Sequence, residues 1–260
     1  MSEVGCEAVM PYGLYISAEG AHAQAQRLEV IANNMANVDT VGFKRELALF
    51  QARYAEQIEQ GGQSPGTGSL DDVGGGIMVG QTKTDFSSGP IRRTGIPTDM
   101  AIEGQGFFMV SKDGETYLTR AGNFRLTSRG ELVTQQGYPV LGHGGAAVTL
   151  ERPGEPFEVT PSGEIQQAGT RMALAIVEPA SPGDLERAGE NLFRPGAEPT
   201  PLRPQQRRVA SGHLELSAVR PTTEMIELIE TSRVLEANTN MMQAQDQMLS
   251  GLIERVMRTD

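Results

Sequence analysis

The stretch IANNMANVDTVGFKRE, residues 31–46, places three asparagines within five positions at the end of an otherwise helical pattern, and then continues into Gly-Phe-Lys. Asparagine lowers helix propensity because its short side-chain amide competes for backbone hydrogen bonds. Asn33, Asn34 and Asn37 therefore indicate a requirement other than helix formation. Gly42 predicts a reversal of the chain just before Phe43.

Upstream of this stretch, apolar residues recur at alternating intervals of four and three, which is the heptad pattern of a helix with one apolar face. The pattern predicts a helix over residues 12–37, about 39 Å long at about 1.5 Å per residue. Four of the seven positions are alanine, so this stripe buries little area by itself and requires a close partner. Its members are Leu14, Ala18, Ala21, Ala25, Leu28, Ala32 and Met35.

A second heptad pattern near the C-terminus predicts another helix, longer than about 30 residues, with Thr222 or Thr223 as its N-cap. Two alternatives remain open for this helix: an intramolecular pair packed on the central domain, or a register that is set among many neighbouring chains. Its seven-residue series is Leu228, Leu235, Met242, Leu249 and Val256, and the alternate positions are Met225, Ser232, Thr239, Asp246 and Ile253.

The segment between the two helices is turn-rich. Residues 61–80 contain eight glycines, which predicts a flexible link or an extended arm. From about residue 90, short β-type runs alternate with turn signals such as Asp113-Gly114. The expected fold class is α+β, with two long terminal helices in a coiled-coil layer, a central all-β domain and a glycine-rich arm. The expected regions are an N-terminal extension (1–10), the N-terminal helix and signature (11–45), the arm (46–90), the β domain (91–215) and the C-terminal helix (216–260).

The composition argues against several classes of protein. A formal net charge of −11, with no cluster of Lys and Arg, argues against nucleic-acid binding. The single cysteine, Cys6, cannot form an internal disulfide. No apolar run of about 18 residues is present, so we expect no membrane insertion. The first residues also lack the pattern of a cleaved signal peptide, and Met10 is an alternative natural start.

No group of residues predicts catalysis. The sequence GQSPG at residues 62–66 fits the nucleophile-elbow pattern, but it has neither the preceding strand nor the following helix. The three histidines lie far apart, and Glu224, Glu227 and Glu230 are explained by the dipole of the first helical turns. Asp71-Asp72 lies in the glycine-rich segment, where nothing fixes a separation. We expect no catalytic residues, no metal, no cofactor and no enzyme activity.

The asparagine stretch resembles the N-terminal signature of the bacterial flagellar rod and hook proteins, A-N-N-(L/M)-A-N-x-x-T-x-G-(F/Y)-(K/R). Ten positions over a span of 13 residues match, from Ala32 to Lys44. The segments TDMAIEGQGFFMV, YLTRAGNFRLTSRGELVTQQGYPVLG and GENLF are similar to the β-domain motifs of this family. EMIELIETSRVLEANTNMMQAQDQML is similar to its C-terminal helix. The segment Ser217–Pro221 departs from the family pattern, because it lacks the two asparagines of S-N-V-N.

The resemblance implies a structural subunit of the flagellar basal-body rod that polymerises into a hollow drive shaft and transmits torque to the hook. It implies that the terminal helices form an inner coiled-coil layer around an export channel and are largely disordered before assembly. The implied partners are further copies in a helical tube, other flagellar rod and hook proteins, and the type III export apparatus. The implied location is the basal body, reached by export to the periplasm without a cleaved signal peptide.

On this interpretation the two ends of the chain carry the assembly contacts. The asparagine amides set the register of assembly by hydrogen bonding to neighbouring subunits, or alternatively they fray the end of the helix before the turn. Phe43 anchors the next segment in a groove of a subunit. The expected assembly-interface residues are Leu14, Leu28, Asn33, Asn34, Met35, Asn37, Gly42, Phe43, Leu228, Leu235, Met242, Leu249 and Val256.

Other functions remain open at this stage. Within the family, the moderately long segment 46–90 favours the proximal rod type over the distal rod or hook type. From other classes, a secreted cell-wall hydrolase and a monomeric binding module with an intramolecular helix pair are alternatives. Cleavage of peptidoglycan by the protein would indicate the hydrolase. Full helix content in a dilute monomer would indicate the binding module.

Overall fold

The computed structural model describes residues 12–52 and 77–257, which form two compact units. The helical unit contains residues 12–35, 46–52, 77–83 and 221–257, and the β unit contains residues 36–45 and 84–220. A helix near each end of the chain and a β-rich region between them confirm the predicted α+β class. The coiled-coil layer and the glycine-rich arm stay predictions.

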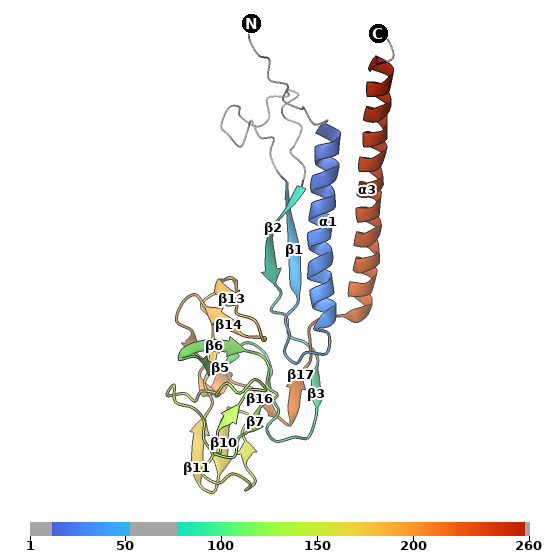
Figure 1. The fold of residues 1–260 in the computed structure, drawn as a ribbon. Helices are drawn as coiled ribbons and strands as arrows, with labels where there is room; N and C mark the ends of the chain where they lie inside the picture. The colour runs from blue at the N-terminus through green and yellow to red at the C-terminus, as the bar shows by residue number, and fades with distance from the viewer. Residues whose placement is uncertain (1–11, 53–76, 258–260) are drawn as a thin grey trace. The chain divides into compact units, whose positions relative to one another are not determined.

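Both predicted helices are present in the helical unit. Helix α1 spans Tyr12–Ala36, so it ends one residue before the predicted end, and α3 spans Pro221–Met257, which is 37 residues. Proline suits the first position of α3, since its missing N–H has no intrahelical partner there, and Glu224 in the first turn complements the helix dipole. The two helices run in opposite directions (Figure 1).

The described ends of the predicted arm are strands. Strand β1 spans Glu46–Ala52, and β2 spans Ile77–Thr84. They pair as a two-stranded sheet that runs alongside α1 (Figure 1). The two ends of the segment 46–90 are thus paired strands, and residues 53–76, which include most of the glycine-rich stretch, lie outside the described residues.

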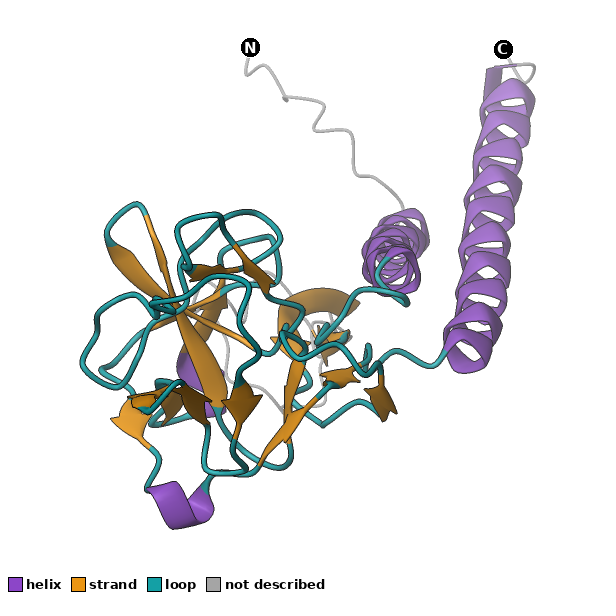
Figure 2. Ribbon diagram, turned by 90° about the horizontal axis from the view of Figure 1, so that it is seen from below, coloured by secondary structure: helices purple, strands orange, loops and turns teal. Residues whose placement is uncertain are grey.

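The β unit consists of short antiparallel strands joined by long loops (Figure 2). Its largest sheet has six strands in the order β13-β14-β6-β5-β12-β15, and a three-stranded sheet has the order β11-β10-β9. Three further pairs are β16-β4, β17-β3 and β7-β8. The strands are β3 (Ile91–Arg93), β4 (Met100–Ile102), β5 (Phe107–Lys112), β6 (Glu115–Thr119), β7 (Arg125–Leu126), β8 (Leu132–Val133), β9 (Glu158–Val159), β10 (Glu164–Gln167), β11 (Thr170–Ala173), β12 (Ile176–Glu178), β13 (Leu185–Arg187), β14 (Phe193–Pro195), β15 (Thr200–Pro201), β16 (Val209–Ser211) and β17 (His213–Glu215).

The turn between β5 and β6 confirms one sequence signal. Asp113 and Gly114 have φ values of 54° and 83°, as a two-residue type I′ hairpin requires. This turn fixes the register in which Lys112 pairs with Glu115. The alternation along β5 then directs Phe108 and Val110 into the main core.

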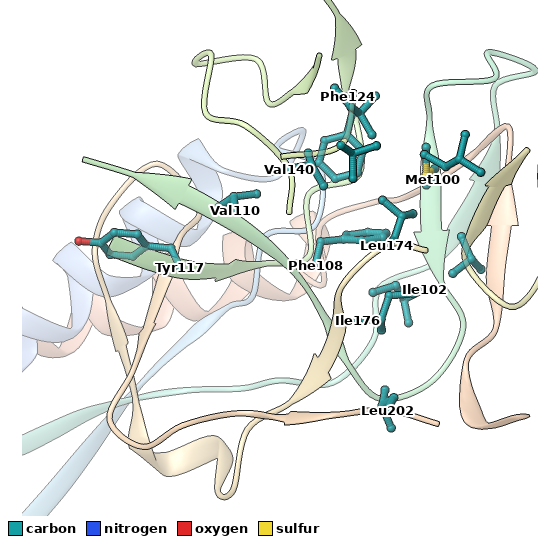
Figure 3. Packing of buried hydrophobic residues seen from close by; sticks show 14 of the residues in the cluster. Met100, Ile102, Phe108, Val110, Tyr117, Phe124, Val140, Leu174, Ile176 and Leu202 are labelled. Carbon is teal, nitrogen blue, oxygen red and sulfur yellow. The ribbon is translucent and has the colours of Figure 1, made fainter. Parts of the chain in front are cut away.

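The main hydrophobic core lies entirely within the β unit. The Phe108 and Phe124 rings meet edge to face, with centroids 5.1 Å apart. Leu174, Ile102 and Ile176 surround Phe108 (Figure 3). The β unit therefore buries large apolar side chains of its own, which is the main requirement for a stable fold.

The signature divides between the two units: residues 32–35 belong to the helical unit, and residues 36–44 belong to the β unit. The Gly42 N–H donates to the Glu215 carbonyl at 2.7 Å, and the Ala218 N–H donates to the Phe43 carbonyl at 3.0 Å. These bonds explain why the boundary between the helical unit and the β unit falls after residue 35, within the predicted N-terminal region, 11–45. The β unit also extends to residues 84 and 220, beyond the predicted limits of 91 and 215.

Candidate assembly interface

Within the helical unit, α1 and α3 meet at points seven residues apart along α1. At the two glycines of α1, long polar side chains of α3 approach the backbone: an added Cβ would lie 3.0 Å and 3.3 Å from their amide nitrogens. An ion pair of 3.6 Å and a hydrogen bond of 3.4 Å follow along the pair. The contacts join Gly13 to Gln245, Gly20 to Asn238, Arg27 to Glu227 and Asn34 to Glu224.

The contacting residues of α1 precede the predicted apolar stripe by one residue. Gly13, Gly20 and Asn34 face α3, whereas the predicted series contained Leu14, Ala21 and Met35. A shift of one residue turns the contact surface by about 100° around the helix. Of the predicted series, Ala21 is buried, Leu14, Ala25, Leu28 and Met35 are partly buried, and Ala18 and Ala32 are exposed.

On α3, the predicted seven-residue series lies beside the polar contacts. Residues four apart occupy the same face of a helix, and Leu228, Met242 and Leu249 each follow a polar contact position, Glu224, Asn238 and Gln245, by four. Leu228, Leu235, Met242 and Leu249 are partly buried, and the side chain of Val256 lies outside the described residues. Of the predicted alternate positions, Met225 and Ile253 are more than half exposed in the single chain, whereas Glu224 and Thr231 are buried. Contact of the alternate positions with a neighbouring chain stays a prediction.

Large apolar side chains remain exposed on another face of α3. Val234, Met241, Met248 and Leu252 are separated by seven, seven and four residues, so they form one stripe along the helix. Their exposed fractions are 45%, 55%, 62% and 58%. We call these four residues the outer stripe. A continuous exposed apolar surface of this kind is typical of a site that another protein chain covers.

The contact between α1 and α3 is weak for its length. Buried side-chain oxygens of Gln24, Thr231 and Gln245 have no hydrogen-bond partner among the described residues. Each such atom opposes burial, because it loses its hydrogen bonds to water without replacement. The two glycines add no side-chain area. The helix pair therefore gains little stability from its own contact.

Asn34 joins three elements of the helical unit. Its Nδ2 donates to the Glu46 carbonyl at 2.9 Å, and its Oδ1 accepts from the Glu46 N–H at 2.8 Å, so the amide pairs with β1 as another strand would. The same Nδ2 lies 3.4 Å from Glu224 Oε2 at the start of α3. Asn34 is 2% exposed, and these bonds explain why a poor helix former occupies this position.

Asn34→Asp is expected to lower the free energy of unfolding of the helical unit by about 2 kcal/mol, because the new carboxylate cannot donate to Glu46 and faces Glu224. Urea unfolding followed by helical circular dichroism measures the loss. Adding Glu224→Gln is expected to restore part of it, since the introduced amide can donate to the carboxylate. Asn240→Asp, at an exposed position of α3, is the control and should change little. An equal effect of Asn240→Asp and Asn34→Asp would contradict this role.

The other two asparagines lie differently. Asn33 is exposed on α1. Asn37 is partly buried, and its Oδ1 accepts from the Thr40 hydroxyl at 3.1 Å in the turn after the helix. Contact of either residue with a neighbouring subunit stays a prediction.

Gly42 and Phe43 are held inside the β unit of their own chain, and their contact with a neighbouring subunit stays a prediction. Gly42 has φ 67°, the left-handed conformation that the predicted chain reversal requires. Phe43 is 4% exposed, and the Arg187 guanidinium lies 4.7 Å from its ring centroid. Arg187 also donates to the Lys44 carbonyl, and Asn191 Nδ2 donates to the Val41 carbonyl at 2.7 Å. The anchoring groove for Phe43 is therefore formed by the same chain.

The described residues offer little for other chemistry. Among residues 12–52 and 77–257, no three His, Cys, Asp or Glu side chains are placed to hold a metal ion. No helix in those ranges is both long and apolar enough to cross a bilayer. Residues 62–66 and Asp71-Asp72, the two weak catalytic patterns, lie outside the described ranges. The described residues thus define an α+β protein with a long helix near each end of the chain and a β-rich unit between them.

Comparison with known proteins identifies the family. Residues 14–44 match the model of flagella basal body rod proteins, residues 101–167 match the D1 domain of flagellar hook proteins FlgE/F/G, and residues 210–255 match the C-terminal model of flagellar basal body rod FlgEFG proteins. The chain belongs to the flagellar basal-body rod protein family.

Complete rod proteins are similar over nearly their whole length. The flagellar basal-body rod protein FlgF of Caulobacter vibrioides is 32% identical over 95% of this chain and 98% of its own. FlgG of the same organism is 33% identical over 91% and 96%. FlgG of Bacillus subtilis is 31% identical over 92% and 97%.

Proposed function

We propose that this chain is a structural subunit of the flagellar basal-body rod, polymerising into the hollow shaft that transmits torque to the hook. The names of its relatives support the rod assignment. The observation that supports polymerisation is the outer stripe of α3, in which four large apolar side chains are exposed in the single chain. Packing of α3 against further copies removes this surface from water.

The weak contact between α1 and α3 supports ordering of the helices during assembly. A helix pair with unpartnered buried oxygens gains stability mainly from additional neighbours. A head-to-tail interface that does not close produces a helical tube. Segments that fold on contact delay polymerisation until a growing end is present. Circular dichroism of the dilute monomer should show less helix than α1 and α3 contain, and full helix content would favour a monomeric binding module.

The proposed partners are further copies of this chain, other rod and hook proteins, and the type III export apparatus, with export to the periplasm without a cleaved signal peptide. The identities to relatives named FlgF and FlgG are nearly equal, at 32% and 33%, so sequence similarity favours neither type. The length of segment 46–90 favours a position in the proximal rod, and this is the hypothesis to test first.

The test is deletion of the gene and complementation with a tagged copy. We expect the deletion to abolish motility, the tagged copy to restore it, and gold-labelled antibody to mark the rod of isolated basal bodies. Gold beside the hook would favour the distal type. A motile deletion strain, or tagged protein that restores motility without entering basal bodies, would contradict a structural role in the rod. Cleavage of peptidoglycan by the purified protein would instead support a cell-wall hydrolase.

A further inference from the structure

One buried carboxylate in the β unit binds several distant segments of the chain. Glu215, at the end of β17, is 1% exposed. Its Oε1 accepts from Lys44 Nζ at 2.6 Å and from the Gly89 N–H at 3.0 Å, and its Oε2 accepts from the Arg120 guanidinium at 3.2 Å. Its backbone carbonyl also accepts from Gly42.

The segments that Glu215 binds are those by which the chain leaves the β unit. Residues 36–45 lead from α1 to β1, residues 84–90 follow β2, and residues 216–220 lead to α3. Glu215 reaches the first through Lys44 and the second through Gly89, and it directly precedes the third. Lys44 Nζ also donates to the Ser87 carbonyl at 2.8 Å, which ties the first segment to the second.

Arg120 attaches this cluster to the strands of the β unit. Its guanidinium donates to the Gly104 carbonyl at 2.6 Å and to the Ile102 carbonyl at 3.3 Å, at the end of β4. Lys44 is fully buried and Arg120 is 4% exposed. The cluster is therefore bound to the frame of the β unit through one cation and to an exit segment through the other.

The charges make Glu215 the member on which the others depend. Burial lowers the pKa of Lys44 and of Arg120 from their ordinary values, and the Glu215 carboxylate opposes both shifts. Removing the carboxylate leaves two buried cations without an anion, which is strongly destabilising. Removing Lys44 leaves a balanced pair of Arg120 and Glu215. Removal of Glu215 and removal of Lys44 should therefore differ in their effect on the stability of the β unit.

We propose that Glu215 is a positioning residue that holds the three exit segments of the β unit together and so fixes where α1 and β2 end and where β1 and α3 begin. The hydrogen bonds within the β unit carry this inference and do not depend on polymerisation. The consequence for flagellar assembly rests on the proposed function. Subunits whose helices begin at fixed points present their contact surfaces with a defined spacing, which a helical tube requires.

Limited trypsin digestion of the full chain tests the local part. In Glu215→Gln, cleavage after Lys44 and Arg45 is expected to accelerate by at least about tenfold, since opening of this segment no longer breaks an ion pair. Cleavage after Arg129, which is exposed in a turn, should keep its wild-type rate and serves as the internal reference. Glu215→Asp, which retains the charge, should recover at least part of the protection.

Two further variants keep the test decisive. Lys44→Met retains the pair of Arg120 and Glu215, so the β unit should fold, and cleavage after Arg45 should still accelerate. Glu115→Gln is the matched control: Glu115 also lies 2.6 Å from an arginine nitrogen, but its side chain is 60% exposed. It should change nothing, because an exposed ion pair contributes little. Wild-type cleavage rates in both Glu215→Gln and Lys44→Met would overturn the proposal.

Motility separates this inference from the proposed function. We expect the Glu215→Gln protein to enter basal bodies poorly and its strain to swim poorly, whereas Glu115→Gln behaves as wild type. Normal rods built from Glu215→Gln subunits with an opened exit segment would overturn the positioning role and leave the rod assignment intact. Absence of the wild-type protein from basal bodies would overturn the rod assignment and leave the protease result interpretable.

Discussion

Met241→Asp and Met248→Asp are each expected to abolish motility and incorporation into the rod while leaving the purified monomer as stable as the wild type. Both side chains are more than half exposed on α3, so the single chain should lose about 0.5 kcal/mol of stability or less. An assembly that covers the outer stripe would bury an unpaired carboxylate in every subunit, and this cost is several kcal/mol each time. Swimming assays and immunoblots of isolated basal bodies measure incorporation, and urea unfolding measures monomer stability.

Gln243→Asp is the control for these variants. It introduces the same charge between the two methionines, but two residues along a helix face different directions, and Gln243 is exposed outside the outer stripe. Its strain should swim normally. Normal motility of the Met241→Asp and Met248→Asp strains would show that the stripe is not covered, and the main structural support for polymerisation would be lost.

The second large effect is expected at the signature glycine. Gly42→Ala should lower the free energy of unfolding of the β unit by about 3 kcal/mol or more and abolish motility. The residue has φ 67°, and an added Cβ would lie 2.5 Å from the Arg120 carbonyl carbon and 2.6 Å from Ala121 N. These are backbone atoms, so the overlap cannot be relieved by a rotamer change. Differential scanning calorimetry measures the loss.

Gly95→Ala separates the two causes of this effect. Gly95 has a similar φ of 75°, but no atom lies within 4 Å of its added Cβ. Alanine there should cost only the left-handed conformation, about 1 kcal/mol. Equal losses for the two variants would mean that the close approach to Arg120 is unimportant and that backbone conformation alone explains Gly42.

Local sequence signals were sufficient for the elements of this fold. The four-and-three spacing before Asn37 gave α1 to within one residue, because an apolar period of this kind reports directly on helical geometry. Asp113-Gly114 identified a hairpin, since the type I′ turn requires positive φ at both positions. Each of these features depends on a few consecutive residues.

The faces of the helices were predicted less well, for a physical reason. Apolar spacing marks the side of a helix with the most hydrophobic surface, and we assigned the pairing to that side. Within the single chain, α1 and α3 instead meet through small and polar residues one position earlier, at Gly13, Gly20 and Asn34. The spacing of apolar residues does not distinguish a partner in the same chain from a partner in another.

The buried charges were missed altogether. Lys44 was recognised only as part of the signature, and neither Glu215 nor Arg120 was selected. The Lys44–Glu215 ion pair joins residues 171 positions apart, so no local period or spacing connects them. Lys44 and Glu215 come together only because β17 pairs with β3 and residues 36–45 fold onto the β unit.

The recurrence of contacts along α1 also bears on how uniquely the two helices are aligned. Contact positions that recur every seven residues on α1, at 13, 20, 27 and 34, do not by themselves fix which part of α3 lies beside which turn. Asn34 does fix it, because its amide holds the start of β1 through Glu46 and lies 3.4 Å from Glu224 in the first turn of α3. A single amide at the end of α1 thus removes an ambiguity that a repeating interface creates.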